Sequence, residues 1–224
     1  MCGRFTLRSS PKSVAQEFGL FDVPDLSPRY NIAPSQAVAI VRQLPEKSQR
    51  ELALLKWGLI PAWADDPAVG DRLANARSET AATKPSFRRA FRYRRCLLVA
   101  DGFYEWQKTD GRKQPYYVRL KDDHPFGIAG LWEQWEKGDK PIESCTILTT
   151  DTNALMKPIH ERMPVIIPPG QYGLWLDSKC QDAKKLEGLL RPFAGEMIAN
   201  QVSTLVNNPK NDVEKCVEPL EALF

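Results

Sequence analysis

Short apolar runs bounded by Gly, Pro or Asp recur along the chain, and their richness in β-branched and aromatic residues is typical of strands. The predicted strands are residues 37–43, 52–60, 96–100, 103–108, 116–120, 126–132, 144–149, 165–167 and 197–204. Eighteen widely spread prolines leave little room for long helices. No internal repeat or low-complexity linker divides the sequence. The pattern predicts one α+β domain over residues 1–224, built on a mainly antiparallel sheet or open barrel.

A few short helices complete the prediction. Residues 11–20 have Ser10 at the N-cap and Pro11 at the first helical position, which is a typical helix start. Two more helices are expected at residues 86–92, after Pro85, and at residues 184–190.

Composition narrows the protein class. With 224 residues, 42% of them hydrophobic and 26% charged, the chain can bury a core without metals or disulfides. No apolar run approaches the roughly 20 residues of a membrane helix, and the N-terminus lacks the apolar stretch of a secretory signal. We therefore expect a protein of the cytoplasm or nucleoid, with no membrane partner, acting as a monomer.

Cysteine and histidine usage disfavours a metal site or redox motif. The five cysteines all lie more than thirty residues apart, so no C-x-x-C pair exists, and there are two histidines. Free thiols in a reducing compartment are the natural interpretation. No metal and no cofactor is expected.

Positive charge is concentrated between Asp71 and Arg95. That segment holds eight basic and two acidic residues, a net charge of +6, whereas the whole chain has +3. Phe87, Phe91 and Tyr93 are interleaved with the arginines. Two interpretations stay open: a nucleic-acid surface, with guanidinium groups on phosphates and aromatic rings on bases, or a solvated helix whose aromatic side chains enter the core.

Cys2 follows the initiator methionine, which is normally removed before a small second residue. The mature chain would then begin with an amine and a thiol on one residue. With an α-amine pKa of about 8, part of the amine is neutral at pH 7 and can form a Schiff base with an aldehyde, and the thiol can close a thiazolidine ring. An N-terminal nucleophile for amide hydrolysis, or no role at all, are the alternatives.

Two further side chains could transfer protons. Alternation along residues 101–106 places Phe103 and Glu105 on one face of a strand. Burial among aromatic residues would raise the pKa of Glu105, as suits a general acid or base, whereas an edge-strand glutamate facing solvent is the alternative. His160 lies between Pro158 and Pro164 and is either a functional loop histidine or a structural one.

Residues 73–80, with the sequence LANARSET, could bind a sugar and a phosphate. Asn75 and Arg77 fall on one side of an extended chain there. A loop that closes on its own backbone is the alternative.

Several motifs together resemble the SRAP (SOS-response-associated peptidase) family. They are MCGRF, RYNIAPSQ, WGLIPAWA, NARSET, CLLVADGFYEWQK, QPYYV, AGLWE, ILTTDTN, IHERMPVII and VNNPKND, in order from residue 2 to about residue 212. The resemblance implies a single α+β domain with a barrel-like β-core and a basic channel for single-stranded DNA. It also implies a thiazolidine crosslink between the N-terminal cysteine and the ring-opened sugar of an abasic site, and autoproteolysis that exposes this cysteine.

The resemblance assigns roles by motif. Cys2 is the nucleophile, Asn75 positions Cys2 or the sugar, and Glu105 and His160 transfer protons. The expected DNA contacts are Arg4 and Arg77 on phosphate, Trp63 as a base-stacking wedge and Pro34 lining the same cleft. The expected partner is single-stranded DNA that contains abasic sites.

Two rival functions remain open at this point. A cysteine-type peptidase, acting mainly to remove Met1, would use Cys2 with Glu105 and His160 but would have no need of a basic channel. A non-catalytic single-strand binding module would not need Cys2.

Overall fold

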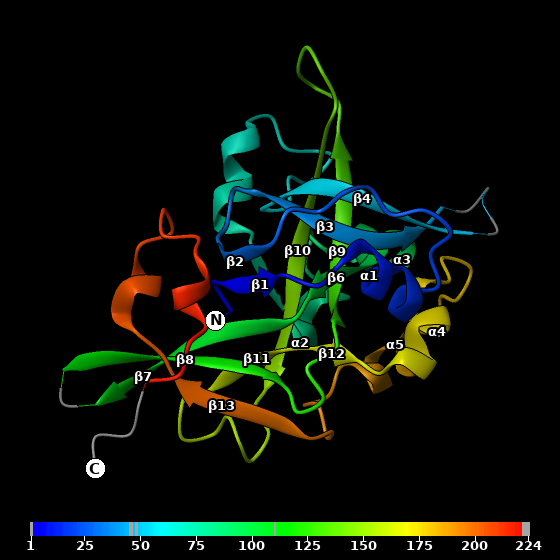
Figure 1. The fold of residues 1–224 in the computed structure, drawn as a ribbon. Helices are drawn as coiled ribbons and strands as arrows, with labels where there is room; N and C mark the ends of the chain where they lie inside the picture. Colours follow the sequence, from blue (N-terminus) through cyan, green and yellow to red (C-terminus); the bar gives the residue numbers. More distant parts are fainter. Residues whose placement is uncertain (1, 45–46, 48, 110, 221–224) are drawn as a thin grey trace.

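The strands of the computed structural model form two sheets, one of which closes into a barrel (Figure 1). The structure describes residues 2–44, 47, 49–109 and 111–220. The larger sheet closes because β10 (Ile142–Asp151) pairs with both β4 (Arg50–Trp57) and β9 (Phe126–Trp135). The ring is completed by β3 (Ala37–Gln43) and β6 (Arg95–Ala100), and its β10–β4 pair is parallel. The predicted single α+β domain with a barrel-like β-core is confirmed.

The second sheet is antiparallel and carries the N-terminus. Its order is β13 (Met197–Gln201), β8 (Arg112–Leu120), β7 (Gly102–Thr109), β1 (Phe5–Leu7) and β2 (Arg29–Ile32). The β7–β8 hairpin projects from the body of the molecule (Figure 1). The short strands β5 (Asn75–Arg77) and β11 (Arg162–Pro164) pair with β10, and β12 (Ile166–Ile167) pairs with β9.

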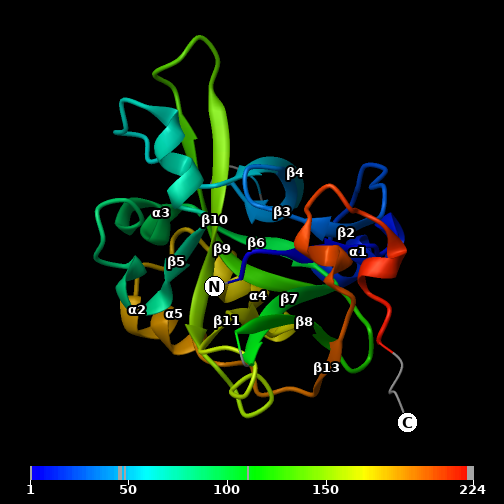
Figure 2. The same cartoon turned by 90° about the vertical axis from the view of Figure 1, so that its left-hand side faces the viewer.

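The helices are short, as the prolines predict. They are α1 (Pro11–Phe18), α2 (Ser78–Ala81), α3 (Arg88–Tyr93), α4 (Tyr172–Leu176) and α5 (Ala183–Leu189), with 3-10 turns η1 (Pro67–Arg72), η2 (Pro169–Gln171), η3 (Thr204–Asn207) and η4 (Glu214–Cys216). Helices α2, α3 and α5 lie on the side of the molecule opposite β2 and the C-terminal segment (Figure 2). Within the described ranges, none of the helices is long and apolar enough to cross a membrane.

Local sequence signals predict α1 well and the end of β4 less well. The Ser10 hydroxyl accepts a hydrogen bond from the Ser13 N–H, and Gly19 ends α1 in the left-handed conformation. Strand β4 ends at Trp57, three residues before the predicted end, because Gly58 has φ 139° and packs against the backbone of Gly70. A Cβ on Gly58 would lie 2.7 Å from the Gly70 carbonyl oxygen, so the turn requires glycine.

The β7–β8 hairpin separates two apolar clusters. Phe103 belongs to the main core of the molecule, whereas Tyr104 packs with Tyr117, Val202 and Val206 in a second cluster. This alternation confirms the predicted two-faced strand at residues 103–108. The second cluster holds the C-terminal segment against β7 and β8.

Two of the three aromatic residues of the arginine-rich segment, Phe87 and Phe91, serve the core, whereas Tyr93 is 47% exposed. Phe87 and Phe91 are buried, so the interpretation that they stack on bases is wrong. Arg94 lies against the Glu133 carboxylate and over the Trp132 ring. The net charge of the segment therefore overstates what is available to a ligand, although Arg88, Arg89 and Arg92 remain exposed.

Arg95 is the polar centre of this part of the fold. It is 3% exposed, and its guanidinium donates to five backbone carbonyls, those of Phe91, Arg92, Trp175, Asp177 and Cys180. It thereby joins α3 to α4 and to the turn after α4.

Arg95→Ala should lower the free energy of unfolding by roughly 3–5 kcal/mol, because several buried carbonyls lose their donor at once. Arg92→Ala, on the exposed side of α3, is the matched control and should change stability by less than about 0.5 kcal/mol. Urea unfolding followed by tryptophan fluorescence measures both. Equal midpoints for the two variants would contradict the structural role.

Candidate active site

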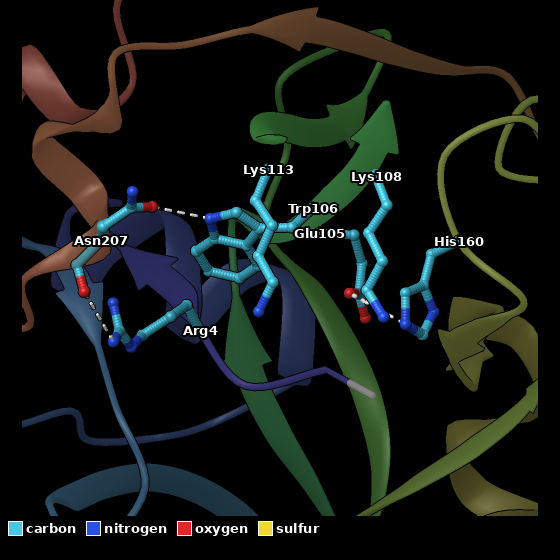
Figure 3. Close-up of a pocket in the computed structure, with 7 residues that line it drawn as sticks. All are labelled: Arg4, Glu105, Trp106, Lys108, Lys113, His160 and Asn207. Carbon is cyan, nitrogen blue, oxygen red and sulfur yellow. Dashed lines mark hydrogen bonds and ion pairs between the residues drawn. The ribbon is translucent and has the colours of Figure 1, made fainter. Parts of the chain in front are cut away.

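An open cavity of about 490 Å³ lies where β7 passes the chain between β10 and β11 (Figure 3). We call it the Glu105 cavity. It is lined by Arg4, Glu105, Trp106, Lys108, Lys113, His160 and Asn207. They come from the N-terminal segment, the β7–β8 hairpin, the loop before β11 and η3. Three of the predicted site residues, Arg4, Glu105 and His160, are thus brought together from distant parts of the sequence.

Glu105 is a buried carboxyl at the base of the cavity. It is 2% exposed, and this burial raises its pKa to about 7. The predicted rise in pKa is confirmed, and the alternative of a solvent-facing glutamate is wrong. Glu105 can therefore donate or accept a proton close to neutral pH.

His160 faces Glu105 across the cavity. Its Nε2 lies 3.8 Å from Glu105 Oε2. The backbone N–H of Arg162 lies 3.0 Å from His160 Nδ1 and the Arg162 carbonyl oxygen lies 3.1 Å from the same nitrogen, so the backbone of Arg162 holds Nδ1 in either tautomer and leaves Nε2 on the side of Glu105. Burial lowers the pKa of His160. Burial thus favours the neutral form of both groups, which is the protonated carboxyl of Glu105 and the unprotonated imidazole of His160.

Strand pairing places Cys2 beside this pair. Phe5 pairs with Phe103 on β7, and the Tyr104 N–H donates to the Arg4 carbonyl at 2.9 Å, so the residues before β1 run alongside β7 towards Glu105. Cys2 is fully buried. Burial and the nearby Glu105 charge raise the pKa of the Cys2 thiol, which is therefore protonated.

Arg4 is fixed in the cavity wall by several contacts. Its Nη1 donates to Asn31 Oδ1 at 3.0 Å and to the Val206 carbonyl at 2.7 Å, and its Nη2 to the Asn207 carbonyl at 3.3 Å. The guanidinium also lies 5.9 Å from the centroid of the Trp106 ring, whose Nε1 donates to Asn207 Oδ1 at 2.7 Å. A cation and an aromatic side chain are thus held rigidly on one side of the cavity (Figure 3).

The other predicted residues do not line the Glu105 cavity. Asn75 and Arg77 lie on β5, opposite Ile147 and Thr149 of β10. The Asn75 Oδ1 is buried and lacks a hydrogen-bond partner in the described part of the chain. Arg77 is exposed.

Trp63 and Pro34 also lie outside the Glu105 cavity. Trp63 is 58% exposed and borders a separate cavity with Pro85 and Arg89. Pro34 is half-buried in the turn between β2 and β3. The exposed indole of Trp63 is available for stacking, as a wedge requires.

Sequence reasoning missed four residues of the Glu105 cavity: Trp106, Lys108, Lys113 and Asn207. Trp106 and Lys108 directly follow Glu105 on β7, and Asn207 lies in the VNNPKND motif. Lys113 could have been found only by pairing β7 with β8 in the correct register. For metals, the described residues contain no group of three or more His, Cys, Asp or Glu side chains that could hold an ion.

Comparison with known proteins identifies the family. The model of the SRAP family, SOS response associated peptidase, matches residues 1–209. The chain belongs to this family, and the resemblance read from its motifs is confirmed.

Proteins of bacteria and of vertebrates are similar in sequence to this chain. The abasic site processing protein YoqW of Bacillus subtilis (strain 168) is 42% identical over 97% of this chain and 99% of its own. YedK of Escherichia coli (strain K12), also named an abasic site processing protein, is 32% identical over 98% of this chain and 100% of its own. A crystal structure of a protein from Bacteroides thetaiotaomicron superposes with a TM-score of 0.87 at 27% identity, covering 98% of this chain and 100% of that one.

Burial of Glu105 should make stability depend on pH. Its pKa is about 7 in the folded state against 4.5 when exposed, so the folded state binds more protons and loses stability as pH rises from about 4.5 to 7. Glu105→Gln removes this cost and should raise the free energy of unfolding by roughly 1–3 kcal/mol at pH 8, with little change at pH 4.5.

Urea unfolding of wild type and Glu105→Gln at both pH values measures the effect. Glu187→Gln, on the exposed face of α5, is the control and should behave like the wild type. A stability difference between Glu105→Gln and wild type that is the same at pH 4.5 and pH 8 would contradict the assignment.

Proposed function

We propose that this SRAP-family protein binds single-stranded DNA at abasic sites and crosslinks to them through Cys2 after Met1 has been removed. The product is a thiazolidine between the Cys2 amine and thiol and C1′ of the ring-opened sugar. The observation that carries the proposal is the Glu105–His160 pair beside Cys2 in a cavity lined by cations. The names of its relatives, abasic site processing proteins, agree with it.

Ring opening is the first step that this geometry supports. An abasic sugar is mostly a cyclic hemiacetal, which opens when O4′ receives a proton and the C1′ hydroxyl loses one. Glu105, with a pKa of about 7, is protonated in a large fraction of molecules at neutral pH and can donate to O4′. His160 favours its neutral form and can accept the hydroxyl proton. The products are an aldehyde at C1′ and a hydroxyl at C4′.

Crosslinking then joins Cys2 to the aldehyde in two additions. The neutral amine of Cys2 adds to C1′, and loss of water, helped by a proton from the acid, gives an imine. The Cys2 sulfur adds to the imine carbon, the thiol proton passes to the Glu105 carboxylate, and the imine nitrogen takes up a proton. Overall, an aldehyde and an aminothiol become a thiazolidine and one water molecule.

The protonated state of the Cys2 thiol weighs against the main rival. A cysteine peptidase needs a thiolate or a base that generates one readily, and burial with the adjacent Glu105 charge opposes ionisation of Cys2. In the thiazolidine mechanism the amine makes the first bond, and the sulfur adds within the same residue to an activated carbon. The raised pKa of Glu105 in turn weighs against a purely passive DNA-binding module, which would gain nothing from a buried carboxyl.

The remaining family positions supply the expected DNA contacts. Arg4 holds phosphate at the cavity, exposed Arg77 holds phosphate on the β5 side, and Asn75 positions Cys2 or the sugar. Trp63 stacks on a neighbouring base, and Pro34 lines the path of the strand. Since an abasic site presents no base to read, such sequence-independent contacts suffice.

The crosslink should depend on both the amine and the thiol of Cys2. Wild type mixed with an abasic single-stranded oligonucleotide should give a heat-stable adduct whose mass is the sum of the two minus one water. Cys2→Ser keeps the amine and should give a reversible imine that borohydride traps. A form that retains Met1 behind an N-terminal tag should give no adduct. Intact mass spectrometry and denaturing gels distinguish the three.

Equal yields of heat-stable adduct from the tagged and processed forms would contradict the aminothiol mechanism. An ordinary cysteine nucleophile would need the thiol alone, and a passive binder would need neither group.

Glu105→Gln and His160→Gln should each slow crosslinking by about 10²–10⁴-fold, because each removes a proton-transfer group. Noncovalent binding to single-stranded DNA should stay nearly unchanged. Single-turnover adduct formation on denaturing gels gives the rates, and Glu187→Gln again serves as the control. Wild-type rates in both variants would show that neither side chain acts as acid or base.

A further inference from the structure

Two lysines face each other across the β7–β8 hairpin at the rim of the Glu105 cavity. Lys108 of β7 and Lys113 of β8 are directly opposed in the antiparallel register. Like charges in this position repel and weaken the pairing of the strands. In the part of the chain that the structure describes, neither ammonium group forms an ion pair or a hydrogen bond. The register of the hairpin therefore places two positively charged residues opposite one another.

Strand alternation directs this pair towards the same surface as Trp106. Trp106 is opposed by Pro115 and lies two residues before Lys108, so the three side chains share one face of the hairpin. Both lysines line the Glu105 cavity, and in Figure 3 Lys113 crosses the Trp106 ring while Lys108 extends beside Glu105 and His160. The positive charge of Lys108 also reaches His160, where it helps to keep the pKa of the imidazole low.

We propose that Lys108 and Lys113 together bind one phosphate of the DNA backbone adjacent to the abasic sugar. An anion between the two ammonium groups removes the repulsion that the register imposes. The inference rests on the proposed function, because C1′ must lie at Cys2 and Glu105, and the phosphodiesters attached to the same sugar then lie at the cavity rim.

The other cations near the site have different places or partners. Arg4 already donates to three protein acceptors, and Arg77 lies outside the cavity on β5. Lys108 and Lys113 can thus contact a phosphate other than the one assigned to Arg4. Because lysine ammonium groups act as point charges, the site reads no sequence and suits any neighbouring nucleotide.

The test compares the double variant Lys108→Ala/Lys113→Ala with Lys12→Ala/Lys184→Ala, which removes two exposed lysines outside the cavity. The probe is a single-stranded oligonucleotide with a tetrahydrofuran abasic analogue, which binds without reacting. The cavity variant should bind about tenfold more weakly at low salt, and its slope of log K against log salt should be shallower by about 0.7, as for one lost phosphate contact. The control should match the wild type.

Replacing single phosphates by neutral methylphosphonates locates the contact. In the wild type, neutralising one of the two phosphates that flank the analogue, on its 5′ or its 3′ side, should weaken binding by about as much as the double alanine substitution does. In the cavity variant the same replacement should cause no further loss. The variant Lys108→Arg/Lys113→Arg should keep the salt slope of the wild type. Without DNA, the double alanine variant should have a melting temperature no lower than that of the wild type, because the alanines remove a repulsive pair.

An unchanged salt slope, or full sensitivity of the cavity variant to every methylphosphonate, would overturn the lysine site. This result is distinguishable from failure of the proposed function. If the wild type forms no adduct with a natural abasic site, the crosslinking function is wrong, whereas binding to the unreactive analogue still decides whether the lysines hold phosphate.

Discussion

Burial of the Glu105 carboxyl beside the Cys2 thiol is the constraint on which this site depends. Both groups lie out of contact with water, so each is more stable in its neutral form. The folded protein loses stability above pH 4.5 by keeping an acid there, and the pairing of β1 with β7 brings the segment that holds Cys2 alongside Glu105. What the site gains is a carboxyl whose proton can be given up and regained near pH 7.

The N-terminal segment must be held firmly for this arrangement to persist, and the C-terminal segment holds it. Asn31 Nδ2 donates to the carbonyls of Val206, Asn208 and Asn211, while its Oδ1 accepts from Arg4. Asp212 accepts from the backbone N–H groups at positions 30 and 31. Asn31 thereby satisfies backbone carbonyls of the C-terminal segment, and Asp212 of that segment satisfies backbone N–H groups of β2, so the two segments are tied together. A segment with few regular elements thus forms one wall of the candidate active site, through Asn207.

Sequence reasoning succeeded where the deciding forces are local. The cap at Ser10 and the alternation around Glu105 need only neighbouring residues to act, and both are as predicted. It failed where contacts between segments far apart in the sequence determine the position of a side chain. The sequence suggested Phe87 and Phe91 as base-stacking residues, but both side chains fill the core. It also included Arg95 in the positive charge of the segment, but the Arg95 guanidinium donates to five backbone carbonyls. The cavity rim was missed because the opposition of Lys108 and Lys113 exists only once the hairpin register is known.

The contrast between the neutral interior of the site and its cationic rim has a consequence for how DNA and chemistry are coupled. Under the proposed function, DNA would bring negative charge to a rim where Arg4, Lys108 and Lys113 are gathered. A phosphate at this rim would disfavour the ionised form of Glu105 and would offset the charge of Lys108 on His160, so it would favour the protonated form of both groups. A larger fraction of Glu105 would then carry the proton that the proposed mechanism uses to open the sugar. DNA binding would thus favour proton donation by Glu105 and oppose proton acceptance by His160, so its two electrostatic effects on ring opening act in opposite directions.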